Sequence, residues 1–333
     1  MKKNILIFRT DRIGDFLITC PAILAIKNYF TESSLTLVSS EKNHLYAKEL
    51  SFFDNIFMYP EKNIFKKAKF FFFILKKKFD YIFVLDGKER SLISILFNSC
   101  KNKFVIYPEH KIKFPYKIFN ISFIKNDAKK SIDDLFQETL RAAKIDTKTS
   151  DHYNFLKDKK CRDVYKLPIN NYVHIHFDEK WFNNIYIKTL SEINPIEEDF
   201  VSFLNELVSR KNDILITTGL LKIDLLEKMK KSFFTKKTSN IYFKNLFDHK
   251  IFFVENSTFQ DLEFLVKSAK ILIACHGSLQ QSASAFRVKI LDIFEKNLEV
   301  WYLRHTKHVI NYKFLHRKSF ILLKQELLSF FDH

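Results

Sequence analysis

Glycine is nearly absent from this chain, whose 333 residues include four, at positions 14, 87, 219 and 277. The G-x-G-x-x-G turn of dinucleotide-binding proteins does not occur, nor does the G-x-x-x-x-G-K-[ST] phosphate loop. Gly87-Lys88 has the lysine of such a loop but lacks the upstream glycine. These absences argue against a P-loop nucleoside triphosphatase and against a nicotinamide-dependent dehydrogenase.

Long apolar runs are also missing. A membrane-spanning helix needs about 20 apolar residues, whereas the longest candidate, Phe70–Leu75, is short and flanked by lysines. The N-terminal run Ile5–Phe8 meets Arg9 and Asp11, so it is too short for a signal peptide. The four cysteines are scattered without a C-x-x-C pair, which is typical of reduced thiols. We therefore expect a cytoplasmic protein.

Acidic residues are fewer than basic ones, 38 against 55, so the net charge is +17. Such a balance favours nucleotide phosphates, anionic lipids or nucleic acid as partners, although a general richness in lysine accounts for part of it. No helix-turn-helix, zinc or RNP-type signature occurs, so charge alone supports nucleic acid, and we expect no nucleic-acid partner.

Short apolar runs alternate with longer amphipathic stretches, which is typical of a parallel sheet covered by helices. In the first half we expect strands at Asn4–Arg9, Leu35–Ser39, Asn55–Tyr59, Asp80–Leu85 and Lys103–Tyr107, and helices at Ala22–Phe30, Ile64–Lys78, Ser91–Asn98 and Ser131–Lys144. In the second half we expect strands at Tyr172–Phe177, Asp213–Thr218, Lys250–Val254, Ile271–Cys275 and Lys289–Phe294, and helices at Ile196–Arg210, Ile223–Phe233, Phe259–Ala269, Leu279–Phe286 and Lys324–Phe331.

The predicted fold class is therefore α/β, with two Rossmann-like doubly wound domains, residues 1–160 and 161–333, facing each other across a cleft. The polar stretch Asp146–Asp163 is the expected linker, and packing of the last helix back on the first domain is left open. Ligands of such folds bind at the carboxyl ends of the strands. All four glycines follow predicted strands, so we expect positive φ or close approach to a ligand there; an ordinary turn preference is the alternative.

Three segments carry residues suited to chemistry. Asp15 lies at a predicted helix start, where it could act as a general base or serve only as an N-cap. His174, His176 and Asp178 share a strand face, so they could bind a metal or be buried. We expect no metal site.

Lys180 could reach a diphosphate or be solvated. At Cys275–Ser278 a strand runs into a tight turn and a small-residue helix, where backbone N–H groups and the Ser278 hydroxyl favour phosphate binding. His276 could hydrogen-bond a leaving diphosphate or be a satisfied turn histidine.

Two basic aromatic segments, Lys62–Lys78 and Tyr107–Lys117, could face an anionic membrane or a phosphorylated lipid together with Lys88 and Arg90. In a lysine-rich protein they are equally readable as ordinary helix surface.

Several segments along the chain resemble those of glycosyltransferase family 9, the ADP-heptose:lipopolysaccharide heptosyltransferases. The similarity begins at Ile5–Asp15 and Pro21-Ala22, continues through Phe79–Leu85, Ile216–Gly219 and Ser257–Leu262, and ends around Ile271–Phe294. The resemblance implies a GT-B fold, an acceptor-binding first domain and a donor-binding second domain. It also implies an inverting glycosyltransferase in which Asp15 is the base.

The resemblance also supplies expected contacts. Donor contacts would come from Lys180, Thr218, Gly219, His276, Gly277, Ser278 and Gln281, and acceptor contacts from Arg9, Arg12, Gly14, Lys88 and Arg90. The donor would be ADP-heptose or another nucleoside-diphosphate sugar, with no further cofactor. The acceptor would be a lipopolysaccharide-core or other lipid-linked surface glycan at the cytoplasmic face of the inner membrane, to which the protein would bind peripherally.

One motif departs from the family pattern Asp-[Ser/Thr]-Gly-x-x-His. His276 stands at the aspartate position and Gln281 at the histidine position. The donor pocket is therefore altered, and a non-catalytic GT-B-like protein that binds a nucleotide or a partner is the alternative.

Overall fold

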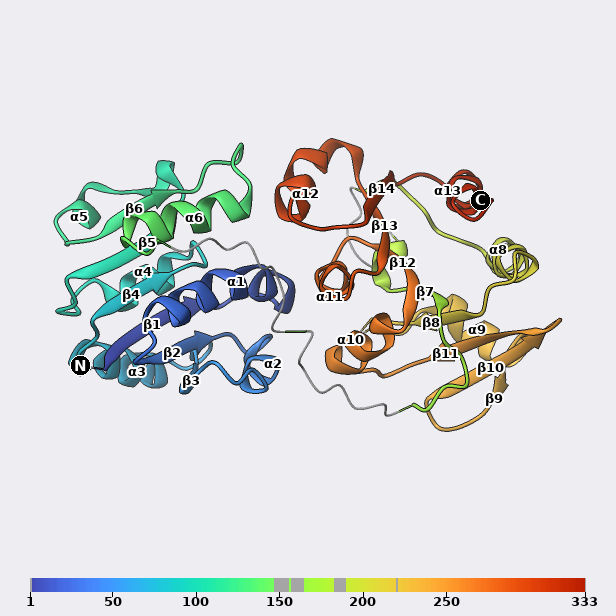
Figure 1. Ribbon diagram of the computed structural model, residues 1–333, viewed down its shortest axis with the longest axis horizontal. Helices are drawn as coiled ribbons and strands as arrows, with labels where there is room; N and C mark the ends of the chain where they lie inside the picture. The colour runs from blue at the N-terminus through green and yellow to red at the C-terminus, as the bar shows by residue number, and fades with distance from the viewer. Residues whose placement is uncertain (1, 147–155, 157–164, 183–189, 220, 333) are drawn as a thin grey trace. The chain divides into compact units, whose positions relative to one another are not determined.

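The computed structural model describes residues 2–146, 156, 165–182, 190–219 and 221–332. The predicted α/β class is confirmed, and the chain forms two compact units (Figure 1), Met1–Tyr153 with Leu303–His308 and Asn154–Tyr302 with Val309–His333. The expected linker Asp146–Asp163 lies almost wholly outside the described residues. No helix in the described part of the chain is long and apolar enough to span a membrane.

The first unit is built on a six-stranded sheet in the order β3-β2-β1-β4-β5-β6, with all neighbours parallel. Its strands are β1 (Lys3–Arg9), β2 (Ser33–Ser39), β3 (Asn55–Met58), β4 (Tyr81–Val84), β5 (Asn102–Tyr107) and β6 (Ser122–Lys125). This order is that of a doubly wound sheet. The strands are added toward one edge from β1 to β3 and toward the other edge from β4 to β6, so the strand order reverses between β1 and β4. Ligands of such sheets bind beyond the carboxyl ends of the two strands at the reversal.

Helices cover both faces of this sheet. They are α1 (Ile13–Tyr29), α2 (His44–Lys48), α3 (Ile64–Lys76), α4 (Glu89–Ile95), α5 (Phe114–Lys117) and α6 (Ile132–Ala142). Helix α1 packs against α6, and α3 packs against α4. Apolar side chains of β1 and β4, such as Leu6, Phe8 and Ile82, are buried in one cluster with Ile74 of α3.

The second unit contains an eight-stranded sheet in the order β14-β13-β12-β7-β8-β11-β10-β9. Its strands are β7 (Tyr172–His176), β8 (Ile214–Thr217), β9 (Thr235–Lys236), β10 (Ile241–Leu246), β11 (His249–Val254), β12 (Ala269–Cys275), β13 (Lys289–Phe294) and β14 (Tyr312–His316). Among the described strands, the pairs β11–β10 and β10–β9 are antiparallel and the other neighbouring pairs are parallel. Here the strand order reverses between β7 and β12, so a ligand is expected beyond the carboxyl ends of these two strands.

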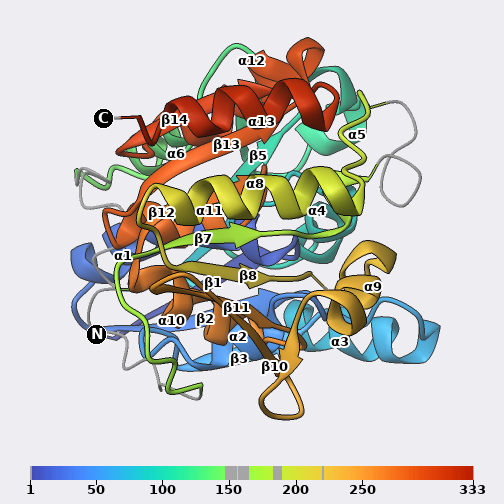
Figure 2. The same cartoon turned by 90° about the vertical axis from the view of Figure 1, so that its right-hand side faces the viewer.

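The helices of this part of the chain are α8 (Glu197–Ser209), α9 (Asp224–Ser232), α10 (Phe259–Lys267), α11 (Leu279–Ala285), α12 (Glu299–Thr306) and α13 (Phe320–Ser329). Helix α12 is divided at Leu303, because Leu303–His308 belongs to the first unit. Figure 2 shows α8 and α13 side by side over one face of the sheet. Phe320 of α13 contacts Phe200 and Phe203 of α8, with ring centroids 5.9 Å and 5.8 Å apart. The last helix therefore packs within the second unit.

The structure corrects several predicted elements. Helix α1 begins at Ile13, well before the predicted Ala22, and contains Pro21. Gly14 and Asp15 therefore lie in its first turn, which confirms the helix start predicted at Asp15 and corrects the bounds predicted for this helix. Strands β6, β9, β10 and β14 and helices α2, α5 and α12 were not predicted from the sequence.

Positive φ was expected at the glycines and is found at Gly87 alone among them. Gly14 is helical, and side chains of the protein approach Gly219 and Gly277 closely. A Cβ on Gly219 would lie 2.5 Å from Glu179 Oε2, and one on Gly277 would lie 2.6 Å from Lys180 Nζ.

Candidate functional site

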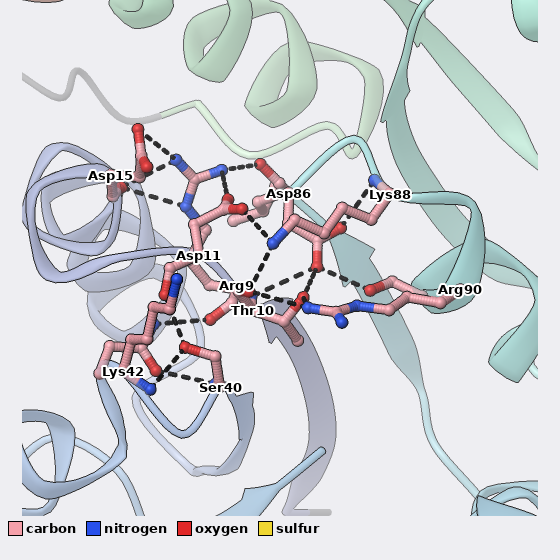
Figure 3. Close-up of polar contacts among 12 residues, drawn as sticks. Arg9, Thr10, Asp11, Asp15, Ser40, Lys42, Asp86, Lys88 and Arg90 are labelled. Atoms are coloured by element: carbon pink, nitrogen blue, oxygen red, sulfur yellow. Dashed lines mark hydrogen bonds and ion pairs between the residues drawn. The ribbon is translucent and has the colours of Figure 1, made fainter. Parts of the chain in front are cut away.

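At the reversal point of the first sheet, Arg9 ends β1 and its guanidinium turns back toward helix α1 (Figure 3). Its Nε and Nη2 donate to the main-chain oxygen of Asp15, at 3.0 and 2.9 Å, and Nη1 donates to the oxygen of Leu85. Nη1 also lies 3.2 Å from Oδ2 of Asp11. The side chain is nearly buried, so Arg9 joins the end of β1, the start of α1 and the end of β4.

Asp15 is the third residue of helix α1, and the N-cap position belongs to Arg12, whose side chain makes no capping bond. The N-cap alternative for Asp15 is therefore wrong. Its carboxylate is 41% exposed, and its Oδ1 lies 4.0 Å from Arg9 Nη2. A carboxylate in the first turn is stabilised by the helix dipole, yet enough of this one is exposed to meet a hydroxyl from outside.

Lys88 and Arg90 follow β4 and turn toward the same loop (Figure 3). The Lys88 ammonium pairs with Asp11 and donates to the Thr10 oxygen at 2.5 Å. Arg90 Nη2 donates to that same oxygen at 3.1 Å. These two of the predicted acceptor-binding cations therefore lie beside Arg9, but each is already engaged with the chain.

Asp86 also belongs to this cluster, although its role was not predicted from the sequence. Its Oδ2 accepts from the hydroxyls of Thr10 and Ser91, at 2.7 and 2.6 Å, and its Oδ1 accepts from the Lys88 N–H at 3.1 Å. Burial raises the pKa of this carboxyl, and the hydrogen bonds from Ser91 and Thr10 oppose that shift. Asp86 holds the ends of β1 and β4 together.

A pocket of about 680 Å³ opens beside this cluster within the first unit. Its walls carry four cationic side chains and one carboxylate, and they comprise Gly87, Lys88, Glu89, Arg90, Tyr107, Lys111 and Lys113. The carboxylate of Glu89 accepts from the Tyr116 hydroxyl at 2.7 Å and lies 3.5 Å from Lys113 Nζ. That bond raises the pKa of Tyr116 to about 12. Asp11 and Glu61 pair with Lys88 and Arg90 from outside these walls, so part of the positive charge is neutralised. The charge that remains suits an anionic ligand.

At the reversal point of the second sheet, β7 is followed by Asp178 and the 3₁₀ turn Glu179–Trp181. Lys180 Nζ lies 2.7 Å from Oδ2 of Asp178 and donates to the oxygens of His276 and Cys275, at 3.0 and 3.4 Å. Burial alone would lower the pKa of Lys180, but the adjacent Asp178 carboxylate outweighs it and raises that pKa. Lys180 is therefore a fixed cation, and the solvated alternative is wrong.

The two strand histidines meet at a hydroxyl instead of a metal. Thr217 Oγ1 lies 2.8 Å from His174 Nε2 and 3.0 Å from His176 Nδ1. Burial lowers the pKa of His176 to about 3, with the charge of Lys180 adding to the effect, and burial also lowers that of His174 well below its usual value. Within the described ranges, no group of three His, Cys, Asp or Glu side chains could hold a metal ion.

The turn after β12 lies beside Lys180. The N–H of His276 donates to the Ile293 oxygen at 3.1 Å, and that of Gly277 donates to Gln280 Oε1 at 2.9 Å. Two of the N–H groups expected to bind phosphate are therefore already used inside the protein. Burial raises the pKa of Cys275 to about 12, so this residue remains a thiol.

A buried carboxylate, Asp292 of β13, organises this turn and was missed from the sequence. It accepts from Gln280 Nε2 at 2.9 Å and from the Tyr312 hydroxyl at 2.7 Å. Its Oδ2 also lies 2.6 Å from His276 Nδ1. His276 is therefore hydrogen-bonded within the protein, and its partner is a buried carboxylate.

The remaining predicted donor contacts are dispersed. Thr218 and Gly219 line a hollow of about 20 Å³, which has room for about one water molecule. Ser278 is the N-cap residue of α11, and Gln281 is buried within that helix. The structure thus brings Lys180, His276 and Gly277 together, while Thr218, Gly219 and Gln281 lie around them without a shared cavity among the described residues.

Comparison with known proteins gives no sequence match: no protein-family model fits the chain, and no curated protein matches it. Solved structures are similar in fold. A family 9 glycosyl transferase from Veillonella parvula has a TM-score of 0.64 at 12% identity, covering 98% of this chain and 89% of the other.

The heptosyltransferase WaaC of E. coli, solved with ADP, has a TM-score of 0.63 at 12% identity and covers 98% and 99% of the two chains. The E. coli ADP-heptose lps heptosyltransferase II has a TM-score of 0.62 at 9% identity, covering 99% of each. The fold is GT-B. The resemblance in the sequence motifs is therefore confirmed at the level of the fold.

Proposed function

We propose that this chain is an inverting glycosyltransferase that moves a sugar, heptose or a related one, from a nucleoside diphosphate to a hydroxyl of a glycan. The observation that carries the proposal is the exposed Asp15 carboxylate, held in the first turn of α1 at the reversal point of a doubly wound sheet. Similarity in fold to glycosyltransferases whose structures contain ADP supports the same assignment.

Asp15 acts as the general base in this mechanism. Its carboxylate accepts the proton of the acceptor hydroxyl as the oxygen attacks the anomeric carbon, and the bond from that carbon to the diphosphate oxygen breaks. Attack from the face opposite the leaving group inverts the anomeric configuration. Arg9 fixes the Asp15 main chain through two hydrogen bonds, so the carboxylate is positioned before the substrate binds.

The second unit binds the donor in this proposal. Lys180 supplies a fixed positive charge at the carboxyl end of β7, and the turn at His276 and Gly277 adjoins it. Phosphate oxygens of the nucleotide would lie against these groups, because a diphosphate requires positive charge and hydrogen-bond donors. We assign no metal or other cofactor to the reaction.

The acceptor would be an anionic, lipid-linked glycan such as lipopolysaccharide core. The cationic pocket around Lys88, Arg90, Lys111 and Lys113 supports an acceptor bearing phosphate or carboxylate groups. Helix α3 supports peripheral binding to an anionic membrane, because Phe65 and Phe72 are 82% and 55% exposed among lysines. The cytoplasmic face of the inner membrane is the proposed location.

The alternative is a non-catalytic GT-B-like protein. It is favoured by the internal use of the N–H groups of His276 and Gly277, which leaves fewer donors for a nucleotide.

A thermal-shift screen of the purified chain against ADP-, GDP- and UDP-sugars tests the proposal. One stabilising donor should then release its nucleoside diphosphate when a phosphorylated core glycan is added, with an inverted product anomer in NMR. Binding without release supports the non-catalytic alternative, and a product of retained configuration contradicts the mechanism.

A further inference from the structure

The imidazole of His276 is held at one edge by a carboxylate from the neighbouring strand. Nδ1 lies 2.6 Å from Oδ2 of Asp292, whose side chain is fully buried, whereas the His276 side chain is 13% exposed. An ionised carboxylate can only accept, so the ring carries its hydrogen on Nδ1. Nε2, at the opposite edge, makes no hydrogen bond within the described residues and is not enclosed.

Asp292 is itself fixed from two further directions. Gln280 Nε2 donates to its Oδ1 at 2.9 Å and the Tyr312 hydroxyl donates to its Oδ2 at 2.7 Å. Gln280 also accepts from the Gly277 N–H at 2.9 Å, so the carboxylate and the turn form one unit. A buried charge is costly unless hydrogen bonds satisfy it, and three donors do so here.

The groups that face His276 come from four elements. Asp292 faces it from β13, and Lys180 lies 3.0 Å from its main-chain oxygen. Tyr302 and Trp301 of α12 lie with ring centroids 4.5 and 6.4 Å from the imidazole. Tyr312 of β14 reaches it through Asp292.

The charge of Lys180 is countered by Asp178 at 2.7 Å. A ligand bearing two phosphates at this turn therefore needs further positive charge. The guanidinium of Arg317 donates to the Lys180 oxygen at 2.6 Å and lies 3.6 Å from Cys275 Sγ, so it is a second fixed cation beside the turn. The imidazole of His276 differs from both cations because its Nε2 makes no hydrogen bond to any residue that the structure describes and can donate one when the ring is doubly protonated.

We propose that Asp292 is a positioning residue that orients His276 so that the ring takes up a proton when a nucleoside diphosphate binds and donates Nε2–H to a phosphate oxygen. The inference rests on the proposed function and deepens it. During transfer the acceptor oxygen bonds to the anomeric carbon, and the electron pair of the breaking bond stays on the phosphate oxygen. His276 hydrogen-bonds that oxygen and keeps its proton, while Asp15 holds the proton of the acceptor.

Titration calorimetry with ADP, in buffers of different ionisation enthalpy, tests the proposal. The wild type should take up a substantial fraction of one proton on binding near pH 7.5. Asp292→Asn should abolish that uptake and weaken ADP binding about tenfold, because the amide donates to Nδ1 and reverses the tautomer. Unchanged proton uptake in Asp292→Asn overturns the proposal.

Asp213→Asn is the matched control. Asp213 lies 3.4 Å from His249 Nδ1 in the same unit, but at the amino ends of β8 and β11. This variant should retain both proton uptake and affinity, and a loss equal to that of Asp292→Asn would show a general effect of removing a carboxylate and overturn the assignment.

Nitrogen-15 NMR of the ligand-free protein separates this inference from the proposed function. His276→Gln assigns the signal, which should show hydrogen on Nδ1 in the wild type and on Nε2 in Asp292→Asn. The same tautomer in both proteins overturns the inference. Failure of ADP, GDP and UDP all to bind the wild type contradicts the proposed function instead.

Discussion

The guanidinium of Arg9 donates two hydrogen bonds to the main-chain oxygen of Asp15, at 3.0 and 2.9 Å, across the turn that joins β1 to α1. This contact fixes the first turn of α1 and with it the exposed carboxylate of Asp15. Because the same guanidinium also bonds the Leu85 oxygen and Asp11, one side chain sets the geometry of the whole cluster.

Replacement of Arg9 by lysine should therefore reduce turnover without removing the base. A lysine cannot reproduce the planar fork, and a displacement of about 1 Å at a reacting group costs roughly 100-fold in rate. We expect Arg9→Lys to lower kcat about 10- to 100-fold in a steady-state assay. Arg210→Lys, which alters a surface pair with Asp332, should keep the wild-type rate; an equal loss would assign the effect to general destabilisation.

The cationic pocket predicts a change in acceptor affinity. Lys111 and Lys113 line it, and Lys113 is well exposed, so their removal leaves the fold intact. The double variant Lys111→Ala/Lys113→Ala should raise KM for a phosphorylated acceptor about tenfold, with kcat within about twofold. Lys101→Ala/Lys129→Ala removes the same charge from exposed positions elsewhere on the unit and should leave KM unchanged. Equal KM values for the two variants would contradict the acceptor assignment.

Helix α3 predicts binding to anionic membranes. The protein should sediment with phosphatidylglycerol vesicles and remain in solution with phosphatidylcholine vesicles. Phe65→Ser/Phe72→Ser should reduce the bound fraction severalfold, because two exposed apolar rings are lost from a lysine-rich helix. Phe247→Ser removes a ring that is 81% exposed in the other unit. It should have no effect, and binding lost equally in both proteins would argue against α3.

The buried histidines predict a loss of stability in acid. Burial lowers the pKa of His176 from 6.5 to about 3. Between about pH 6.5 and pH 3, the His176 ring is protonated in the unfolded chain but neutral in the folded protein. The free energy of unfolding should fall through this window, by up to about 1.4 kcal/mol per pH unit for this ring.

Urea denaturation across this pH range measures the slope. His176→Gln should reduce it, whereas His110→Gln at an exposed position should not. The same slope in both variants would show that other groups cause the acid sensitivity.

The central strands could be predicted because their apolar runs are short, buried on both faces and bounded by turns. Strand β14 was missed because Tyr312–His316 lies at the sheet edge, only partly buried and interrupted by a lysine. The range predicted for the first helix begins too late, at Ala22, directly after a proline, a residue that commonly marks a helix boundary. In the structure, Pro21 is buried inside the helix.

The partners of the site residues depend on strand register, which a single sequence does not give. Asp292 lies opposite Ala274 in the parallel pair β12–β13, and His276 is two residues farther on the same face. The available signal was an aspartate in the middle of an apolar strand. Asp86 is similar, since Phe8 lies opposite Val84 and the next residues on that face are Thr10 and Asp86.

Transfer by Asp15→Asn is the measurement that tests the central claim most directly. The substitution keeps the size of the side chain and the main-chain contact with Arg9, but it removes the base. With the donor found by the thermal-shift screen and a saturating acceptor, kcat should fall about 100- to 10,000-fold, while the donor still stabilises the variant against heat. Transfer at the wild-type rate would contradict the account.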